Sequence, residues 1–186
     1  VFDFRSLYPS LIRTFNIDPL TYVGTAERAE AAQRTPSGAL FRRDEEGILP
    51  ALVARLWEER SDAKARGDAI GSQAVKILMN SLFGVLGSPA SRLFSPAVAN
   101  AITAAGRWVI EHAAAHATER GHVVIYGDTD SVFVDCGEVD TARACALGEA
   151  PRAEISSALG ARLAAEFGCQ SHLELEFEKV YERFWM

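Results

Sequence analysis

The chain lacks several features that would mark a specialised class of protein. Its three cysteines lie far apart and form no C-x-x-C spacing, which argues against a disulfide framework and against a zinc site. No apolar run approaches the roughly 18 residues of a membrane span, and the first residues do not resemble a signal peptide. We therefore expect a cytoplasmic globular protein with reduced thiols and no membrane partner.

A net positive charge is missing as well. The formal net charge is −6, which argues mildly against nucleic acid as a partner. The acidity is uneven, however, because residues 122–186 hold twelve acidic side chains against five basic ones, while residues 1–121 are almost balanced. Either a metal-binding cleft or a plain solvated surface would explain that bias, and the count alone does not choose between them.

The hydrophobic pattern predicts strands at both ends of the chain. Residues 1–5 are typical of a strand, and "HLELEFE" at 172–178 alternates as a strand should. A β-hairpin is predicted around "YGDTDSVF" at 126–133, where Gly and Asp suit a tight turn. After the first strand, Pro9 suits the first turn of a short helix, and residues 16–47 look like an irregular connection.

Helices fill most of the remaining chain. Two amphipathic helices at 49–66 and 72–83 are joined by the short link "GDAIG" and should form an antiparallel hairpin. A long helix is expected from Pro96, with Ser95 as its N-cap, and Pro151 is expected to open another. Without the helical hairpin the order is β-α-β-β-α-β. This order predicts an α+β, ferredoxin-like fold: an antiparallel sheet with helices on one face and an inserted helical hairpin.

Side-chain alternation predicts that carboxylates gather on the open face of this sheet. The side chains expected to face the helices are Phe2, Phe4, Leu173, Leu175 and Phe177. Asp3, Glu176 and Glu178 should then face the other way, beside Asp128 and Asp130 at the hairpin turn. Two carboxylates about 5 Å apart repel by roughly 3 kcal/mol at an effective dielectric near 20, unless they are solvated, protonated or bridged by a cation. Mg²⁺ suits Asp3 plus Asp130, because it completes its shell with substrate phosphates.

Side chains that could meet such phosphates lie on the helical hairpin. Lys76, Asn80 and Phe83 fall on one stripe of the second helix, and Arg60 and Lys64 are one turn apart on the first. Three cations converging on one side would suit a triphosphate. Each residue also has an ordinary explanation, because Lys and Arg on a helix surface are mostly solvated and Phe is mostly core.

Three ordered motifs resemble those of family B DNA polymerases: "DFRSLYPSLI" (3–12), "KILMNSLFG" (76–84) and "YGDTDS" (126–131). The similarity covers essentially the whole chain and is strongest to bacterial members. It implies a DNA-directed DNA polymerase, which transfers dNMP from a dNTP to a primer 3′-OH by two-metal in-line attack and releases pyrophosphate. The implied cofactors are two Mg²⁺ ions, with Mn²⁺ as an alternative.

The resemblance also implies roles for individual residues. Asp3 and Asp130 would bind the metals with the backbone carbonyl of Phe4, and Asp128 would be a further catalytic acid near the primer end. The turn formed by Ser6, Leu7 and Tyr8 would contact the triphosphate, with the Tyr8 ring as a steric gate against ribose. The side chains implied to bind the dNTP from the fingers are Arg60, Lys64, Lys76, Asn80 and Phe83. Glu176 and Glu178 match an acidic motif whose role is unassigned.

Further implications concern domains and partners. Residues 1–47 would form the first part of the palm with a connection, 48–90 the fingers and 91–186 the second part of the palm. The chain begins without Met, and the exonuclease and thumb of the family are absent, so we expect a fragment that is poorly active alone. The implied partners are primer–template DNA and dNTP, with a sliding clamp for the full-length protein. Phe83 stands where the family usually has Tyr, which removes a hydroxyl-mediated contact.

Two other functions stay open on the residues alone. A nucleotidyl cyclase uses a similar palm and carboxylate pair, but it has no helical hairpin with a K-x-x-x-N stripe. A non-catalytic module of the RRM type would bind RNA through stacking aromatic side chains on its open sheet face, where this chain is expected to carry carboxylates.

Overall fold

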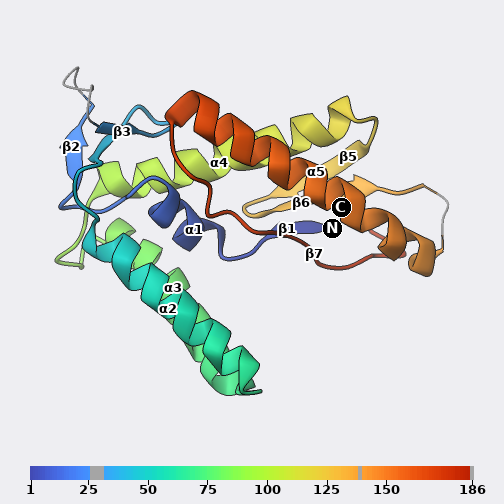
Figure 1. Ribbon diagram of the computed structural model, residues 1–186, viewed down its shortest axis with the longest axis horizontal. Coiled ribbons are helices and arrows are strands. Elements are labelled where there is room, and N and C mark those ends of the chain that lie inside the picture. The colour runs from blue at the N-terminus through green and yellow to red at the C-terminus, as the bar shows by residue number, and fades with distance from the viewer. Residues whose placement is uncertain (26–31, 138–139, 185–186) are drawn as a thin grey trace.

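Figure 1 shows the computed structural model of the chain, which describes residues 1–25, 32–137 and 140–184. Over these residues the fold contains two antiparallel sheets and five helices. Two long helices lie along the main sheet, and a helical hairpin projects away from the body (Figure 1). The expected α+β class is therefore confirmed.

The main sheet is assembled from distant parts of the chain. Its strands are β1 (Phe2–Phe4), β5 (Val123–Asp128), β6 (Ser131–Asp135) and β7 (Leu175–Phe177). Their spatial order is β5-β6-β1-β7, and every neighbouring pair is antiparallel. The last strand is shorter than the predicted range of 172–178. Because β1 is central, its residues have neighbours on both sides.

Side chains alternate across β1 as its sequence predicts. Phe2 and Phe4 are buried in the hydrophobic core, and Phe2 lies opposite Phe177 with the ring centroids 5.8 Å apart. Asp3 belongs to the other face, where its cross-strand neighbours are Ser131 and Glu176. Helices cover the core face of the sheet, so the face that carries Asp3 is the one that a ligand could reach.

Two helices cover the core face of the sheet. The apolar side of α4 (Pro96–Glu119) is fully buried through Val98, Ile102 and Val109. Pro96 opens this helix as predicted, although Ser95 makes no side-chain capping hydrogen bond. The second helix, α5 (Thr141–Phe167), runs beside α4 and ends at Gly168, whose φ of 61° lies in the left-handed region that favours glycine.

The start of α5 differs from the prediction. The helix begins at Thr141, where the Asp140 side chain accepts a backbone hydrogen bond, and Pro151 lies inside it instead of opening it. An interior proline costs a helix about 3 kcal/mol. Packing on β7 offsets that cost: Gly148 lies so close to the Phe177 ring that a Cβ would overlap it. The sequence prediction failed because it weighed Pro151 without this tertiary contact.

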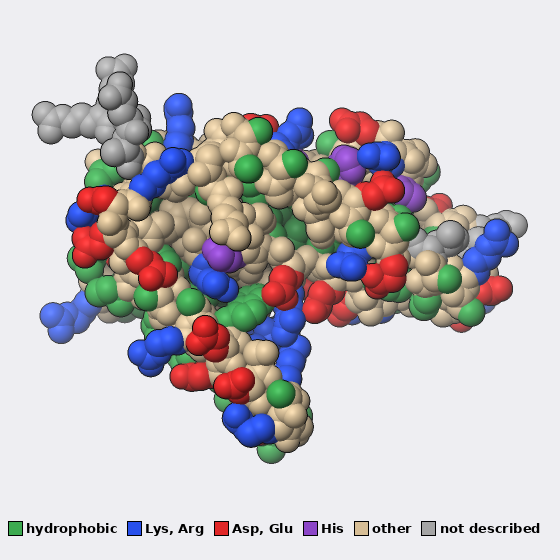
Figure 2. Space-filling view, viewed as in Figure 1, with side chains coloured by type: hydrophobic (Ala, Val, Ile, Leu, Met, Phe, Trp, Pro, Cys, Tyr) green, Lys and Arg blue, Asp and Glu red, His purple; other side chains and the backbone are tan. Residues whose placement is uncertain are grey.

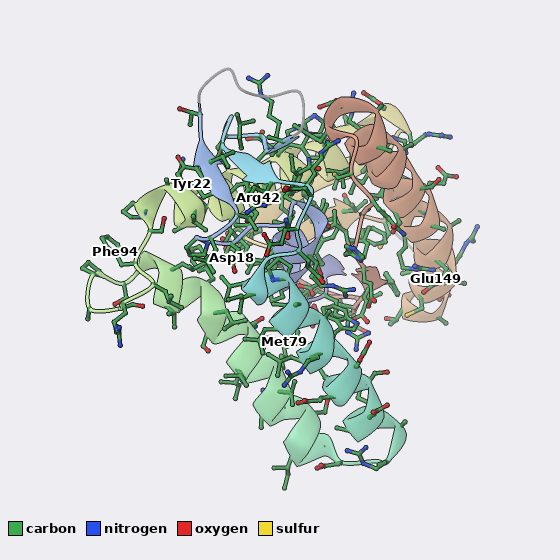
Figure 3. The ribbon with its side chains drawn as sticks, turned by 60° about the vertical axis from the view of Figure 1, so that its left-hand side comes forward. Asp18, Tyr22, Arg42, Met79, Phe94 and Glu149 are labelled. Carbon is green, nitrogen blue, oxygen red and sulfur yellow. The ribbon has the colours of Figure 1, made fainter. Side chains whose placement is uncertain are left out.

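The projecting hairpin consists of α2 (Ile48–Ala65) and α3 (Ala69–Gly87). Gly67 turns the chain between them with a φ of +72°. The α3 helix starts three residues earlier than predicted, because the Asp68 side chain caps it by accepting a hydrogen bond from the Gly71 N–H. Met79 is fully buried (Figure 3). The expected antiparallel hairpin is present, with a shorter link.

The described residues of the 16–47 segment correct a further expectation, because they are not irregular throughout. They contain a second antiparallel sheet in the order β2 (Tyr22–Gly24), β4 (Leu40–Arg42), β3 (Ala32–Arg34). The sequences of these strands, YVG, LFR and AQR, show no alternation of apolar and polar residues. The buried Asp18 ties this region to α2, since its carboxylate accepts a hydrogen bond of 2.7 Å from the Leu49 N–H (Figure 3).

The composition of α3 bears on the expectation that no segment approaches a membrane span. Among the residues that the structure describes, this one helix is long and apolar enough to cross a membrane, judged by length and composition only. Ile70, Ile77 and Leu78 are exposed on it. The same helix packs along α2 and carries Lys76 and Asn80, so its composition is weak evidence for a membrane.

Candidate active site

Two aspartates from distant parts of the chain meet on the open face of the main sheet. Asp3 lies on β1, opposite Ser131 at the start of β6. Asp130 precedes Ser131 in the β5–β6 turn, and its carbonyl oxygen accepts a hydrogen bond of 2.7 Å from the Phe4 N–H. The strand pairing therefore places the two carboxylates that the sequence singled out beside each other.

The electrostatics of this pair confirm that the two groups interact. Burial, followed by the charges of Asp130 and Glu178, raises the pKa of Asp3 to about 6. Burial and the neighbouring Asp128 carboxylate raise the pKa of Asp130. The ammonium group of Lys76 acts in the opposite direction on both aspartates. Lys76 belongs to α3, so the helical hairpin supplies a cation to the carboxylate pair on the sheet.

The donor set fits a metal ion that is only partly held by protein. No group of three or more His, Cys, Asp or Glu side chains is gathered tightly enough for a metal within residues 1–25, 32–137 and 140–184. Mg²⁺ usually takes one or two carboxylates and keeps water or phosphate oxygens for the rest of its shell. The raised pKa values of Asp3 and Asp130 are the electrostatic condition that a bound divalent cation would relieve.

The other acidic residues of the predicted site lie around Asp3 and Asp130. Asp128 is exposed, and its Oδ1 accepts hydrogen bonds from the Thr129 N–H at 2.7 Å and from the Thr129 hydroxyl at 3.2 Å. Glu178 adds negative potential at both aspartates, and Glu176 adds it at Asp3. The acidic side chains predicted for the open face are therefore all close to it.

The turn after β1 leads into α1 (Leu7–Thr14), and Tyr8 lies at its start. Ser6 adopts a left-handed backbone with a φ of 49°. The Leu7 side chain is buried, which leaves its backbone as the group available to a ligand. The Tyr8 ring packs against Phe83 of α3, with centroids 4.6 Å apart, and on α4 a Cβ added to Gly106 would lie 3.1 Å from Tyr8 Cε1.

The basic side chains of the helical hairpin that the sequence singled out lie in two places. Arg60 on α2 is 8% exposed, and its Nη1 donates a hydrogen bond of 3.2 Å to the Ser6 hydroxyl. Lys64 lies one turn further along α2, close enough to Arg60 that the charge of Arg60 contributes to lowering its pKa, after burial and Arg5. Lys76 lies near the aspartates, and Asn80 is exposed one turn beyond it on α3.

Sequence reasoning missed Arg5, which lies at the centre of these groups. Its Nη1 is 3.1 Å from Glu174 Oε2 and 3.6 Å from Glu176 Oε1, and its guanidinium carbon lies 5.5 Å from the centre of the Trp57 ring on α2. The signal was available, because Arg5 follows Asp3 by two positions and must share its face.

The model of DNA polymerase family B matches residues 1–186. The chain therefore belongs to DNA polymerase family B. It is 39% identical over 189 residues to DNA polymerase II of Escherichia coli (strain K12), with 100% of this chain and 24% of that protein covered. It is 32% identical over 207 residues to the DNA polymerase delta catalytic subunit of Glycine max, covering 96% of this chain and 18% of that one.

A solved structure shares the fold of this family B chain. The family B DNA polymerase from the hyperthermophilic archaeon Pyrobaculum calidifontis superimposes with a TM-score of 0.68 at 26% sequence identity. The match covers 97% of this chain and 23% of that protein. The chain thus spans about a quarter of the length of the E. coli relative and of this structural neighbour.

Proposed function

We propose that this chain carries the catalytic centre of a DNA-directed DNA polymerase. The reaction is the template-directed attack of a primer 3′-OH on the α-phosphate of a dNTP, with release of pyrophosphate. The observation that carries the proposal is the convergence of Asp3, Asp130 and Lys76 from the three motifs typical of the family. Two carboxylates with a cation beside them suit a metal–triphosphate substrate, because each charge has an opposite partner once the ligand binds.

In this proposal Asp3 and Asp130, with the carbonyl of Phe4, hold two Mg²⁺ ions, which activate the attacking hydroxyl and stabilise the leaving oxygen when bound. Asp128, at the outer edge of the cluster, adds negative potential near the primer end. The backbone of Ser6 and Leu7 contacts the triphosphate. The Tyr8 ring occupies the space that a ribose 2′-OH needs.

The helical hairpin binds the incoming nucleotide in this account. The side chains assigned to that task are Arg60, Lys64, Lys76, Asn80 and Phe83. The contact between Arg60 and Ser6 supports the assignment, because it brings α2 to the turn that is proposed to hold phosphate. The packing of Phe83 on Tyr8 supports it as well, since a base pair and its sugar would lie against two adjacent rings. In this account Glu176 and Glu178 add negative potential next to the metals.

The division of the chain follows the same assignment. Residues 1–47 and 91–186 form the palm and residues 48–90 the fingers, which agrees with the projection of the α2–α3 hairpin from the body (Figure 1). The palm sheet is assigned a ferredoxin-like topology, and its antiparallel order β5-β6-β1-β7 supports that assignment. Its partners would be primer–template DNA and dNTP, with a sliding clamp for a longer parent protein.

The experiment that tests the function is single-nucleotide addition to a primer–template at low salt with saturating Mn²⁺. The chain has a formal net charge of −6 and should hold a DNA duplex only weakly, so we expect slow additions that match the template base. Asp3→Ala or Asp130→Ala should lower the rate by several orders of magnitude, and Asp128→Ala should lower it less. A rate that Asp3→Ala leaves unchanged, or additions that ignore the template, would refute the function.

A further inference from the structure

Arg5 connects three parts of the molecule at the edge of the proposed nucleotide site. Its backbone N–H donates a hydrogen bond of 2.9 Å to the Glu174 carbonyl, and its side chain reaches the carboxylates of Glu174 and Glu176. Its guanidinium also lies over the Trp57 ring of α2. Both carboxylate contacts use the same terminal nitrogen, Nη1, so they engage only part of the donor fork of the guanidinium.

Arg5 also acts electrostatically on Arg60 and Lys64 of α2. After burial, its positive charge is the largest cause that lowers the pKa of Arg60, and the same holds for Lys64. Three cations therefore share one small region, where the carboxylates of Glu174 and Glu176 act on Arg60 and Lys64 in the opposite direction. Figure 2 shows basic side chains along the side of the hairpin that faces the body, next to acidic ones.

Two guanidinium donors in this region have no hydrogen-bond partner among the described residues. They are the buried Nε atoms of Arg60, a residue that is 8% exposed, and of Arg5. Because both Nε atoms are buried, an anion would meet the terminal Nη donors of the two guanidinium groups, and a multiply charged anion with several oxygens suits such a pair. A triphosphate has that chemistry, whereas a single carboxylate has too few oxygens.

We propose that Arg5 is a further triphosphate-binding residue, and that Glu174 and Glu176 hold it in place until the anion arrives. This inference rests on the proposed function, because it concerns the phosphate tail of the same substrate. A phosphate oxygen then competes with the two carboxylates for the guanidinium of Arg5, while Trp57 keeps its plane in position. Glu174 and Glu176 thus lower the affinity for the anion and at the same time orient the cation that binds it.

The test measures the binding of inorganic tripolyphosphate to the chain by calorimetry, without divalent metal. Omitting the metal keeps Asp3 and Asp130 out of the measurement. Arg5→Ala should weaken binding by about tenfold, the usual effect of losing one charged hydrogen bond, and Arg5→Lys should weaken it less. The double variant Glu174→Gln with Glu176→Gln should bind more tightly than the unaltered chain, because the competing carboxylates are gone.

Arg42→Ala is the matched control, since Arg42 also pairs with two carboxylates, those of Asp44 and Glu45, but lies on the small sheet. It should leave tripolyphosphate binding unchanged. A purely structural role for Arg5 predicts a lower unfolding temperature for Arg5→Ala with unaltered affinity, and no gain in the glutamine variant. Either result would overturn the inference, as would the absence of measurable binding by the unaltered chain.

The inference and the proposed function can fail separately. If Arg5→Ala kept the KM for dNTP of an active unaltered chain, the inference would be wrong and the polymerase function would stand. If tripolyphosphate binding depended on Arg5 while no template-directed addition occurred, the role of Arg5 in anion binding would stand and the polymerase function would be wrong.

Discussion

The rings of Tyr8 on α1 and Phe83 on α3 pack against each other, with their centroids 4.6 Å apart and their planes inclined by 48°. Because α3 belongs to the projecting hairpin, a movement of that hairpin would change the space next to Tyr8. Burial and the charge of Asp130 both raise the pKa of Tyr8, so its ring also lies close to the proposed metal site. One side chain thus touches the hairpin and borders the carboxylates of the proposed metal site.

Replacing Tyr8 should relax the choice of sugar. In Tyr8→Ala the ring that blocks a ribose 2′-OH is missing, so ribonucleotide use should rise while dNTP affinity stays within a few fold. Competition between each dNTP and the matching ribonucleotide measures the ratio. Tyr22→Ala, which removes a half-buried ring from the small sheet, is the control and should leave the ratio unchanged. If Tyr8→Ala discriminated as well as the unaltered chain, the gate would lie elsewhere.

Gly106→Ala should reveal how tightly Tyr8 is held. The new methyl group would lie 3.1 Å from Tyr8 Cε1, so the ring or α4 must shift by a few tenths of an ångström. Overpacking of this kind costs about 1–3 kcal/mol, against a helix-propensity gain of about 1 kcal/mol. Gly160→Ala in α5 gains the same propensity and meets no atom within 4 Å, so it should raise the unfolding temperature. Equal stabilisation by both variants would show that Tyr8 is free to move.

Without divalent metal, Asp3→Asn should stabilise the chain near neutral pH. The pKa of Asp3 is raised to about 6, so the folded chain takes up a proton at higher pH than the unfolded chain does. Lowering the pH through 6 therefore stabilises the unaltered chain relative to its unfolded state, whereas the asparagine variant lacks this response. Unfolding temperatures in EDTA should differ most above pH 6, and the difference should shrink toward pH 4. A difference that is independent of pH would contradict the elevated pKa.

The sheet face that carries Asp3 and Glu176 was predictable, because it depends on a period of two that "VFDFR" and "HLELEFE" both display. The register between β1 and β6 was not, since the alignment of Asp3 with Ser131 depends on packing of distant segments. The three-residue strands of the small sheet carry no periodic signal. Packing of Gly148 against Phe177 overrides the proline signal in α5.

The role of Arg5 stayed hidden for a different reason. Its place on the open face follows from alternation, but its partners come from two segments, residues 174–176 and α2, that meet it only in the folded chain. The same holds for Arg60, whose spacing from Lys64 predicted a shared face but not its hydrogen bond to Ser6. Sequence patterns determine the direction of a side chain within one element, whereas contacts between elements require the fold.

Metal-dependent dNTP binding tests the central claim, that Asp3 and Asp130 form one metal–nucleotide site, most directly. Equilibrium dialysis of labelled dNTP should show retention by the unaltered chain in Mn²⁺ that falls by about tenfold or more in EDTA, because the metal joins the triphosphate to the carboxylates. Asp3→Asn and Asp130→Asn should each show the same loss in the presence of Mn²⁺. Asp135→Asn, an exposed carboxylate at the far end of β6, should bind as the unaltered chain does. The account would be contradicted if the unaltered chain retained as much dNTP in EDTA as in Mn²⁺ and if Asp3→Asn retained as much dNTP as the unaltered chain.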